Sequence, residues 1–531
     1  MTGSVDPGVG VPAAIPTAVG AAADATVLDA LDLATSVSTS SGVDTDIDTD
    51  IDIDIDAGIG DAGIEDAGSQ ARTNGRGPTI GVVVGALVSM VALCIGLRPV
   101  GDSSFLTHLA TGRLILDGHL PRTDPYTFTA GGDAWTVQSW FASTIYAQIE
   151  RWFGLHGIQM FTGLLAALIG AMLWRLSRSA HSLVGRVAAV TPAMVVASGY
   201  WAERPFLIGL ACLAAVVLAC EGAFDPRWLL PVMWLWVNTH GSFPFAVVAV
   251  GAYIMGGHLD RDDTSTERRT LLYVAGGTVL GALNPLGLKL LIFPLQLLGG
   301  SPLLHNIVEW KPPAFDEMWQ RVFLVNIAVV MLMLARRGSW RLGVTAALFI
   351  PLGLFAARNI VITSVVLVPV LARSLSDVGS LDWRARRPTL RVLLAGVAVI
   401  SMMAVATAMS KPAERQGIYP VAALRWWSDQ YGLDADTRLA TPDVVGNYLE
   451  AAYGGKVPTF LDDRAELFTG DLVPMVLDLY RAEPGALDHL DELGVHGVLW
   501  YADRGLATAI AQSTTWHIVY SDRAWLIAVP R

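Results

Sequence analysis

A polar stretch after the first long apolar run contains the residues best suited to chemistry. Asp102 stands a few residues beyond that run, and His108 and Asp124 follow before the next strongly apolar segment. An ionisable group at membrane depth, or on the rim of a membrane cavity, is costly and usually functional, and a carboxylate there could act as a general base. We therefore predict Asp102 and Asp124 as catalytic residues within a catalytic loop, residues 98–156.

Each of these candidates has a structural alternative. Asp102 could cap the short helix expected over residues 103–117, and one residue can both cap a helix and act in catalysis. Asp124 precedes Pro125, a pair that is typical of ordinary turns. We expect His108 to bind substrate, although it could also be a metal ligand, a base or an interfacial side chain. The loop holds no second histidine at ligand spacing.

Three further polar elements interrupt the apolar runs later in the chain. They are Glu203 with Arg204, Asn238 with His240, and Glu309 within the loop 301–320. Broken membrane helices usually line a polar cavity, and arginine is well suited to hold a phosphate. Glu203 and Arg204 could instead be an interfacial ion pair. Asn238 and His240 could belong to a turn that simply breaks a helix. We expect all five residues to bind substrate on the same membrane face as the catalytic loop.

The composition indicates a polytopic membrane protein. Of 531 residues, 53% are hydrophobic and 16% are charged, whereas about a quarter of the residues of a soluble globular protein are charged. All three cysteines lie inside apolar runs, so no disulfide framework or cysteine metal motif is implied. No Walker loop, GxSxG elbow or HExxH sequence occurs in its required context, which argues against a nucleotide-driven or hydrolytic enzyme. We expect no nucleic acid partner.

Residues 1–77 differ from the rest of the chain. They hold 14 Asp and Glu against 2 Lys and Arg, which accounts for the whole net charge of −12, and they contain no Trp, Phe or Tyr. Such a segment cannot bury enough apolar surface to offset the entropy lost on ordering. The alternating Asp and Ile of residues 44–56 could bind calcium or form a strand, but the glycines and spacing of a calcium loop are missing. We predict a disordered, acidic, cytoplasmic tail.

Residues 78–410 are expected to form a membrane domain of about eleven transmembrane helices. Because basic residues precede the first span, the positive-inside rule places the N-terminus in the cytoplasm and the catalytic loop outside. Residues 135–153 have one apolar helical face and are predicted to lie along the membrane interface, because a further span here would move Arg175 outside. The expected spans are 80–97, 158–174, 187–201, 206–220, a broken hairpin over 228–257, 271–283, 322–334, 342–355, 360–371 and 392–409.

After residue 410 the sequence changes to ordinary charged and turn residues, and residues 411–531 are predicted to form a small α/β domain. An odd number of spans places this domain outside, with the catalytic loop. The strand-like runs are 457–461, 497–501 and 525–529. A polar cluster beside one of them could grip a ligand, although an internal ion-pair network is the favoured interpretation. The cluster consists of Asp462, Asp463, Arg464 and Glu466.

At these residues the chain resembles the polytopic glycosyltransferases of the C-type fold, which use polyprenyl-phosphate sugars. Their pattern is an Asp shortly after the first span, a G-x-hydrophobic-P turn after a short helix, and an aromatic interfacial helix ending in Phe-Gly. Asp102, residues 117–121 and residues 140–154 match it. The chain looks still closer to uncharacterised bacterial polytopic membrane proteins of that kind, through the elements 108–113, 121–129, 203–205, 236–241, 284–287, 309–312 and 460–468.

The resemblance implies an integral-membrane glycosyltransferase that moves a sugar from a polyprenyl-phosphate donor to an acceptor outside the plasma membrane. Asp102 would take the proton of an acceptor hydroxyl, and Arg204 or Arg358 would hold the leaving lipid phosphate. The resemblance adds Arg113, which ends the element 108–113, to the substrate-binding residues. Many members carry a second acid where this chain has Ser-Ser after Asp102, so a divalent metal cofactor stays an open question.

Two other functions fit parts of the sequence. In a transporter or flippase, the same polar residues would line a permeation path, but no clear repeat of broken helices relates the two halves of the chain. In a scaffold, the C-terminal domain would bind a cell-wall component and the membrane part would only anchor it, for which eleven spans are far more than enough. The glycosyltransferase is the preferred prediction.

Overall fold

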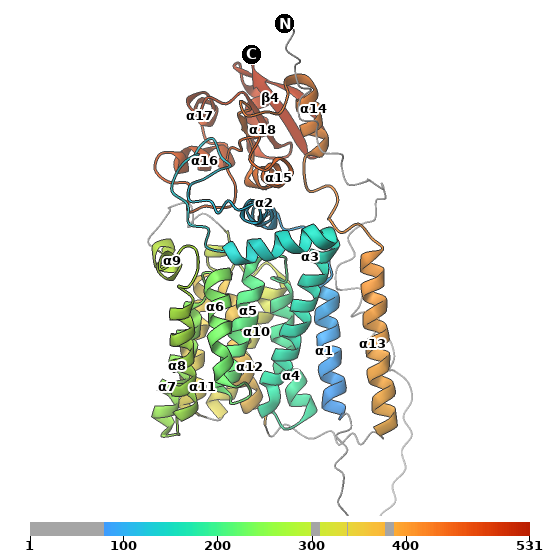
Figure 1. The fold of residues 1–531 in the computed structure, drawn as a ribbon, viewed down its shortest axis with the longest axis vertical. Helices are drawn as coiled ribbons and strands as arrows, with labels where there is room; N and C mark the ends of the chain where they lie inside the picture. The colour runs from blue at the N-terminus through green and yellow to red at the C-terminus, as the bar shows by residue number, and fades with distance from the viewer. Residues whose placement is uncertain (1–78, 299–307, 337, 377–386) are drawn as a thin grey trace, which may run out of the picture. The chain divides into compact units, whose positions relative to one another are not determined.

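The computed structural model describes residues 79–298, 308–336, 338–376 and 387–531. This part of the chain is mainly helical and ends in a domain with a small sheet, as the sequence predicted (Figure 1). The predicted disordered tail, residues 1–77, lies outside the described residues, as does the segment 301–307 of the loop that contains Glu309.

The membrane domain is built from apolar helices, each overlapping one of the expected spans. They are α1 (Ile80–Gly96), the second part of α3 (Trp140–Leu176), α4 (Leu183–Ser198), α5 (Pro205–Cys220), α6 (Leu229–Thr239), α7 (Pro244–Asp260), α8 (Ser265–Leu280), α10 (Met318–Arg336), α11 (Trp340–Phe355), α12 (Asn359–Ser374) and α13 (Arg387–Met409). A helix satisfies its own backbone hydrogen bonds, which is why apolar spans take this form in lipid.

By length and composition, three helical segments of the described chain are long and apolar enough to cross a membrane, and five more are apolar but shorter. The three are Trp140–Ser179, Met318–Arg336 and Pro388–Met409. The chain is therefore a multi-pass membrane protein, and the total of eleven spans stays a prediction.

α1 packs closely against the second part of α3 through small residues. A Cβ atom on Gly96 would stand 2.8 Å from the Cβ of Ala166. One on Gly170 would stand 2.9 Å from the Cβ of Ala92. Small residues let two membrane helices approach at this distance. The contact fixes the end of α1 and hence the start of the loop that carries Asp102.

A bend at Gly154 divides α3, because this residue has the positive φ of 62° that glycine adopts without strain. The part before the bend lies across the ends of the upright helices in Figure 1, where the sequence predicted an interfacial helix. The short helix α2 (Ser104–Leu116) packs on it. A Cβ on Gly112 would stand only 1.9 Å from the Ser143 carbonyl oxygen, so α2 can lie this close only with glycine there.

The C-terminal domain contains a four-stranded sheet of order β1-β2-β4-β3 with helices around it. β1 pairs parallel with β2, and β4 pairs antiparallel with both β2 and β3. The elements are α14 (Val421–Tyr431), β1 (Leu439–Ala440), α15 (Asp443–Tyr453), α16 (Leu472–Arg481), α17 (Ala486–Glu492), β2 (Gly497–Tyr501), α18 (Gly505–Gln512), β3 (Trp516–Ser521) and β4 (Trp525–Pro530). The short helix α9 (Lys289–Leu298) precedes the gap after residue 298.

Two of the three strand-like runs are confirmed as strands, β2 and β4, but residues 457–461 are not part of the sheet. This run pairs instead with the catalytic loop, where Thr459 and Thr127 form an isolated parallel bridge. The Thr459 N–H donates to the Tyr126 carbonyl at 2.9 Å, and the Phe128 N–H donates to the Thr459 carbonyl at 2.9 Å. An extended apolar run can satisfy its backbone on another loop as well as in a sheet, and sequence does not distinguish the two.

Candidate functional site

A cavity of about 430 Å³ lies where the catalytic loop, the helix ends and the C-terminal domain meet. Its lining combines acids, arginines and histidines from segments far apart in the sequence. Six of the ten predicted site residues line it: Asp102, His108, Arg204, His240, Glu309 and Arg358. The C-terminal domain adds Asp463, Arg464 and Glu466.

Asp102, Arg204 and Glu309 form a continuous ion-pair chain along the cavity. Nε of Arg204 donates to Oδ2 of Asp102, and Nη1 of Arg204 donates to Oε1 of Glu309 at 2.6 Å. The Asp102 side chain is 13% exposed, whereas Arg204 and Glu309 are about a third exposed. The arginine therefore bridges two carboxylates of one cavity, and the alternative of an interfacial ion pair between Glu203 and Arg204 is not what the structure shows.

Glu203 fixes the backbone at Asp102 through hydrogen bonds. Oε1 of Glu203 accepts the N–H groups of Gly101 at 2.5 Å and of Asp102 at 3.0 Å. Burial raises the pKa of this carboxyl, and the two backbone donors oppose the rise. Asp102 in turn accepts the Ser104 N–H at 3.0 Å, which is the capping contact offered as its structural alternative. The capping bond uses one oxygen, so it does not exclude a role in the cavity.

Both histidines of the cavity are held by serine hydroxyls. Nδ1 of His108 lies 3.1 Å from Oγ of Ser143, and Nδ1 of His240 lies 2.8 Å from Oγ of Ser242. Burial lowers the pKa of His108 to about 4, with Asp102 opposing this shift, so the imidazole is neutral at neutral pH. These side chains can exchange hydrogen bonds with a ligand but supply no positive charge to it.

Arg358 is the cation of the cavity that is best placed to bind an anion. Its guanidinium lies over the ring of Trp310, 4.5 Å from the ring centroid, and it forms no ion pair within the described part of the chain. Its backbone N–H donates to the Glu309 carbonyl at 3.1 Å, which joins the start of α12 to the Glu309 segment. A stacked guanidinium keeps its N–H edge free for a planar or tetrahedral anion.

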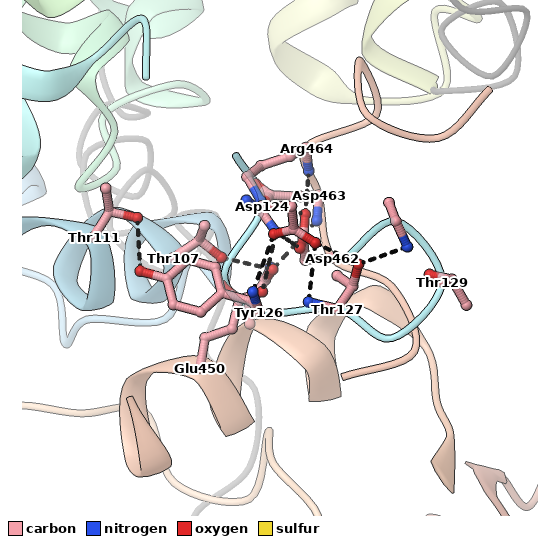
Figure 2. Close-up of polar contacts among 12 residues, drawn as sticks. Thr107, Thr111, Asp124, Tyr126, Thr127, Thr129, Glu450, Asp462, Asp463 and Arg464 are labelled. Atoms are coloured by element: carbon pink, nitrogen blue, oxygen red, sulfur yellow. Dashed lines mark hydrogen bonds and ion pairs between the residues drawn. The ribbon is translucent and has the colours of Figure 1, made fainter. Parts of the chain in front are cut away.

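The polar cluster of the C-terminal domain divides between the cavity and a buried ion-pair network, which we call the junction network and which consists of Asp124, Glu450, Asp462 and Arg464. Arg464 donates to Oδ1 of Asp124 at 2.6 Å and to both oxygens of Asp462 (Figure 2). Its guanidinium also lies over the rings of Trp135 and Tyr126. The favoured interpretation of this cluster, an internal ion-pair network, thus describes Asp462 and Arg464. Asp463 and Glu466 line the cavity outside this network, and Arg464 belongs to both.

Three predicted residues lie apart from the cavity in structural contacts. Asp124, with a side chain 0% exposed, accepts the Tyr126 and Thr127 N–H groups besides Arg464. Arg113 bonds Glu150 and the Ala451 carbonyl, which ties α2 to the interfacial part of α3 and to α15. Oδ1 of Asn238 accepts the indole N–H of Trp140 at 2.9 Å, and its amide donates to carbonyls of α6 and of the residue after α8.

The residues that the sequence prediction missed in the cavity come from elements far apart in the chain. Gln138, just before α3, lines the cavity with an amide nitrogen that has no partner, and Trp319 and Phe293 form part of an apolar wall. The described residues contain no group of three or more His, Cys, Asp or Glu placed to hold a metal ion. These residues come together only in the folded structure, so no local sequence pattern could have identified them.

No family model and no curated protein sequence matches the chain. Its structure is similar to that of the archaeal oligosaccharyltransferase AglB from Archaeoglobus fulgidus, solved in complex with an inhibitory peptide and a dolichol-phosphate. The TM-score is 0.52 at 13% sequence identity, and the match covers 80% of this chain and 69% of that chain. At this identity the likeness shows the fold, and it supports the C-type glycosyltransferase fold that the sequence motifs predicted.

Proposed function

We propose that this chain is an integral-membrane glycosyltransferase that moves a sugar from a polyprenyl-phosphate donor to an acceptor outside the membrane. The observation that carries the proposal is a cavity at the ends of apolar helices that joins carboxylates to a stacked arginine, which forms no ion pair with any described residue. The fold likeness to an oligosaccharyltransferase whose structure holds a dolichol-phosphate supports a lipid-phosphate donor. Fold alone does not assign chemistry, so the residues of the cavity must account for it.

The phosphate end of the proposed site is formed by Arg358, with Arg204 nearby. Glycosyl transfer leaves a lipid phosphate whose negative charge grows as the bond to the sugar breaks. Preorganised donors aimed at that charge stabilise the transition state because they need not reorganise during the reaction. Arg358 has its charge unpaired, whereas Arg204 already serves two carboxylates. We therefore assign the phosphate to Arg358 first.

The acidic end contains Asp102 and Glu309. A sugar leaving a phosphate develops positive charge at its anomeric carbon, and a nearby ionised carboxylate stabilises that charge. Asp102 was predicted from sequence as the base, but one of its oxygens accepts the Ser104 N–H and the other is paired with Arg204. We assign Asp102 this electrostatic role. His108, His240 and Glu309 are proposed to bind the sugar or the acceptor.

A divalent metal does not fit the acids of the cavity well. The two carboxylates that could share a metal ion, Asp102 and Glu309, are already bridged by the guanidinium of Arg204. No third acid, histidine or cysteine of the described residues completes a ligand group with them. We therefore derive no step through a metal.

The proposal includes the orientation and domain boundaries expected from the arginine pattern. Residues 78–410 would form the plasma-membrane domain, and residues 411–531 a domain on its outer side, with residues 1–77 in the cytoplasm. The catalytic loop contacts the C-terminal domain through Val100 and Glu414 and through Thr127 and Thr459, which supports the placement of both on one side. Cysteine labelling from each side of sealed vesicles tests this: an exposed cysteine at position 133 and one at position 503 should react from the same side.

The function itself is tested by transfer from polyprenyl-phosphate sugars to saccharide, lipid and peptide acceptors by purified protein in lipid nanodiscs. Asp102→Asn should lower the rate on the order of a hundred- to a thousand-fold, because a fixed charge facing the anomeric carbon is lost. Its melting temperature should stay close to that of the wild type, since asparagine keeps an oxygen for the Ser104 N–H. Wild-type protein that transfers no sugar from any lipid phosphate, but moves a lipid-linked sugar across vesicles, would replace this proposal with a transporter.

A further inference from the structure

We infer that Asp463, in the C-terminal domain, is the carboxylate that accepts the proton of the attacking acceptor hydroxyl, an inference that rests on the glycosyl transfer proposed above. The C-terminal domain would then supply a catalytic group, rather than only a binding surface. Four observations support this assignment. Asp463 lines the cavity, it forms no ion pair with a described residue, its surroundings raise its pKa, and its backbone is held by neighbouring residues.

Asp463 and Asp102 reach the cavity from different domains and meet at Ser104. The Ser104 N–H donates to Asp102, and the Ser104 side chain lowers the pKa of the Asp463 carboxyl. All three residues line the same cavity. The two carboxylates therefore reach one cavity near the start of α2, from the catalytic loop and from the C-terminal domain.

The two carboxylates differ in the charge around them. Asp102 has both oxygens engaged, one by the Ser104 N–H and the other by Arg204. Among the described residues, no Lys, Arg or His forms an ion pair with Asp463. A base needs a lone pair that is free to take a proton, and a carboxylate already paired with a guanidinium is a poor one.

The surroundings of Asp463 also raise its affinity for a proton. Burial raises its pKa to about 7, and the neighbouring Asp462 adds to the rise, while the Ser104 hydrogen bond and the charge of Arg204 oppose it. The charge of Asp443 of α15 raises it further. A general base works best with a pKa near the working pH, because it is then ionised often enough and still basic enough.

The backbone of Asp463 is held on both sides. Its N–H donates to Oδ1 of Asn447 at 3.3 Å, and the same oxygen accepts the Thr107 hydroxyl of α2 at 2.9 Å. The next residue, Arg464, is fixed in the junction network, and Figure 2 shows Asp463 directly beside it. Such support restricts the side chain to the orientation that faces the cavity, as a reacting group requires.

The proposed step balances without another reagent. The acceptor oxygen forms a bond to the anomeric carbon as the bond from that carbon to the phosphate oxygen breaks, and its electron pair leaves with the lipid phosphate. The hydroxyl proton passes to an oxygen of Asp463. The products are the glycosylated acceptor, the lipid phosphate beside Arg358, and a protonated Asp463 that returns its proton to water.

The decisive experiment measures kcat/KM for transfer against pH in nanodiscs. Wild-type kcat/KM should rise as pH rises through about 7, because Asp463 must be ionised to act. Asp463→Asn should lose on the order of a hundred- to ten-thousand-fold in kcat, and its residual activity should no longer rise over this interval. Asp102→Asn should be slower than the wild type yet keep the rise. Asp436→Asn, an exposed acid of the same domain, is the matched control and should behave as the wild type.

Melting temperatures separate catalysis from folding. If Asp463→Asn has a lowered melting temperature, Asp463→Glu is the deciding variant. A lower rate, together with a rise in kcat/KM whose midpoint pH is shifted, supports the role of a base. A wild-type rate with an unchanged midpoint pH overturns it. Wild-type activity in a folded Asn variant, or an unchanged rise in its profile, would overturn the assignment while leaving the glycosyltransferase intact. Wild-type protein inert towards every lipid-phosphate sugar would instead remove the proposed function, and this inference with it.

Discussion

The junction network and the cavity contain the same kinds of residue, arginine and carboxylates, and differ in whether ion pairs already hold all of those residues. In the junction network Arg464 is 6% exposed and stands among three carboxylates, and both oxygens of Asp124 accept at least two donors. In the cavity, Arg358 and Asp463 form no ion pair among the described residues. The difference separates a structural contact from a site: a charge that lines a cavity and is not held in an ion pair, rather than charge itself, indicates where a ligand can bind.

Arg464→Met should have the largest effect on stability and so gives the sharpest test of this comparison. It would leave Asp124 and Asp462 buried without their cation, and breaking a buried pair in this way costs about 3–5 kcal/mol. Because this network joins the catalytic loop to the C-terminal domain, we expect a large fall in melting temperature in nanodiscs. Arg464→Lys keeps the charge but has fewer hydrogen-bond donors, so its melting temperature should lie between those of the wild type and the methionine variant. A methionine variant as stable as the wild type would show that the network does not hold the junction.

Arg358→Gln should behave in the opposite way, with a large effect on activity and little on stability. Loss of a charge-assisted bond to the phosphate costs about 1.5–3 kcal/mol, which is roughly a ten- to hundredfold fall in kcat/KM. Its melting temperature should not fall, because no ion pair within the described chain is broken. Arg523→Gln, at an exposed arginine of the C-terminal domain, is the control. Normal transfer by the Arg358 variant would move the phosphate to Arg204.

The parts of this fold that were predictable from sequence are those set by local chemistry. Apolar runs gave the membrane helices, and the aromatic segment before Gly154 gave the interfacial helix, because a span there would have contradicted the arginine pattern. Strands β1 and β3 were not expected. β1 has only two residues, and β3 is exposed along much of its length and bulged near Tyr520, so neither produces a clear apolar pattern.

The candidate site divides along the same line. Asp102, Arg204 and Glu309 were predicted because each is polar beside an apolar helix. The separation of Asp124 from the cavity depends on a contact with Arg464, 340 residues further along the chain, which no local pattern records. Asp462 and Asp463 are adjacent and chemically identical, yet the first is bound by Arg464 and the second lines the cavity. Pairing between distant segments decides such roles, and a single sequence contains no direct trace of it.

The smallest effect is expected at Glu450, where only the pH dependence of stability should change. This carboxyl is fully buried, 3.9 Å from Arg464, and burial, followed by the charge of Asp462, raises its pKa well above the ordinary value. The folded protein therefore holds a proton here that the unfolded chain releases, so the contribution to stability is full at acid pH and is lost as pH rises.

Glu450→Gln removes this proton from the balance while keeping the shape of the side chain. Near pH 4 its melting temperature should match that of the wild type, and above that pH it should become the more stable protein, by at most about 1.4 kcal/mol for each pH unit that a single proton can contribute. Thermal melts from pH 4 to pH 8 measure the difference, with Glu483→Gln at an exposed position as the control. Asp463 titrates in both proteins and cancels from the comparison. If the melting temperatures of variant and wild type instead change with pH in parallel, Glu450 is ionised in the folded protein. Arg464 would then hold all three carboxylates of the junction network in their charged form.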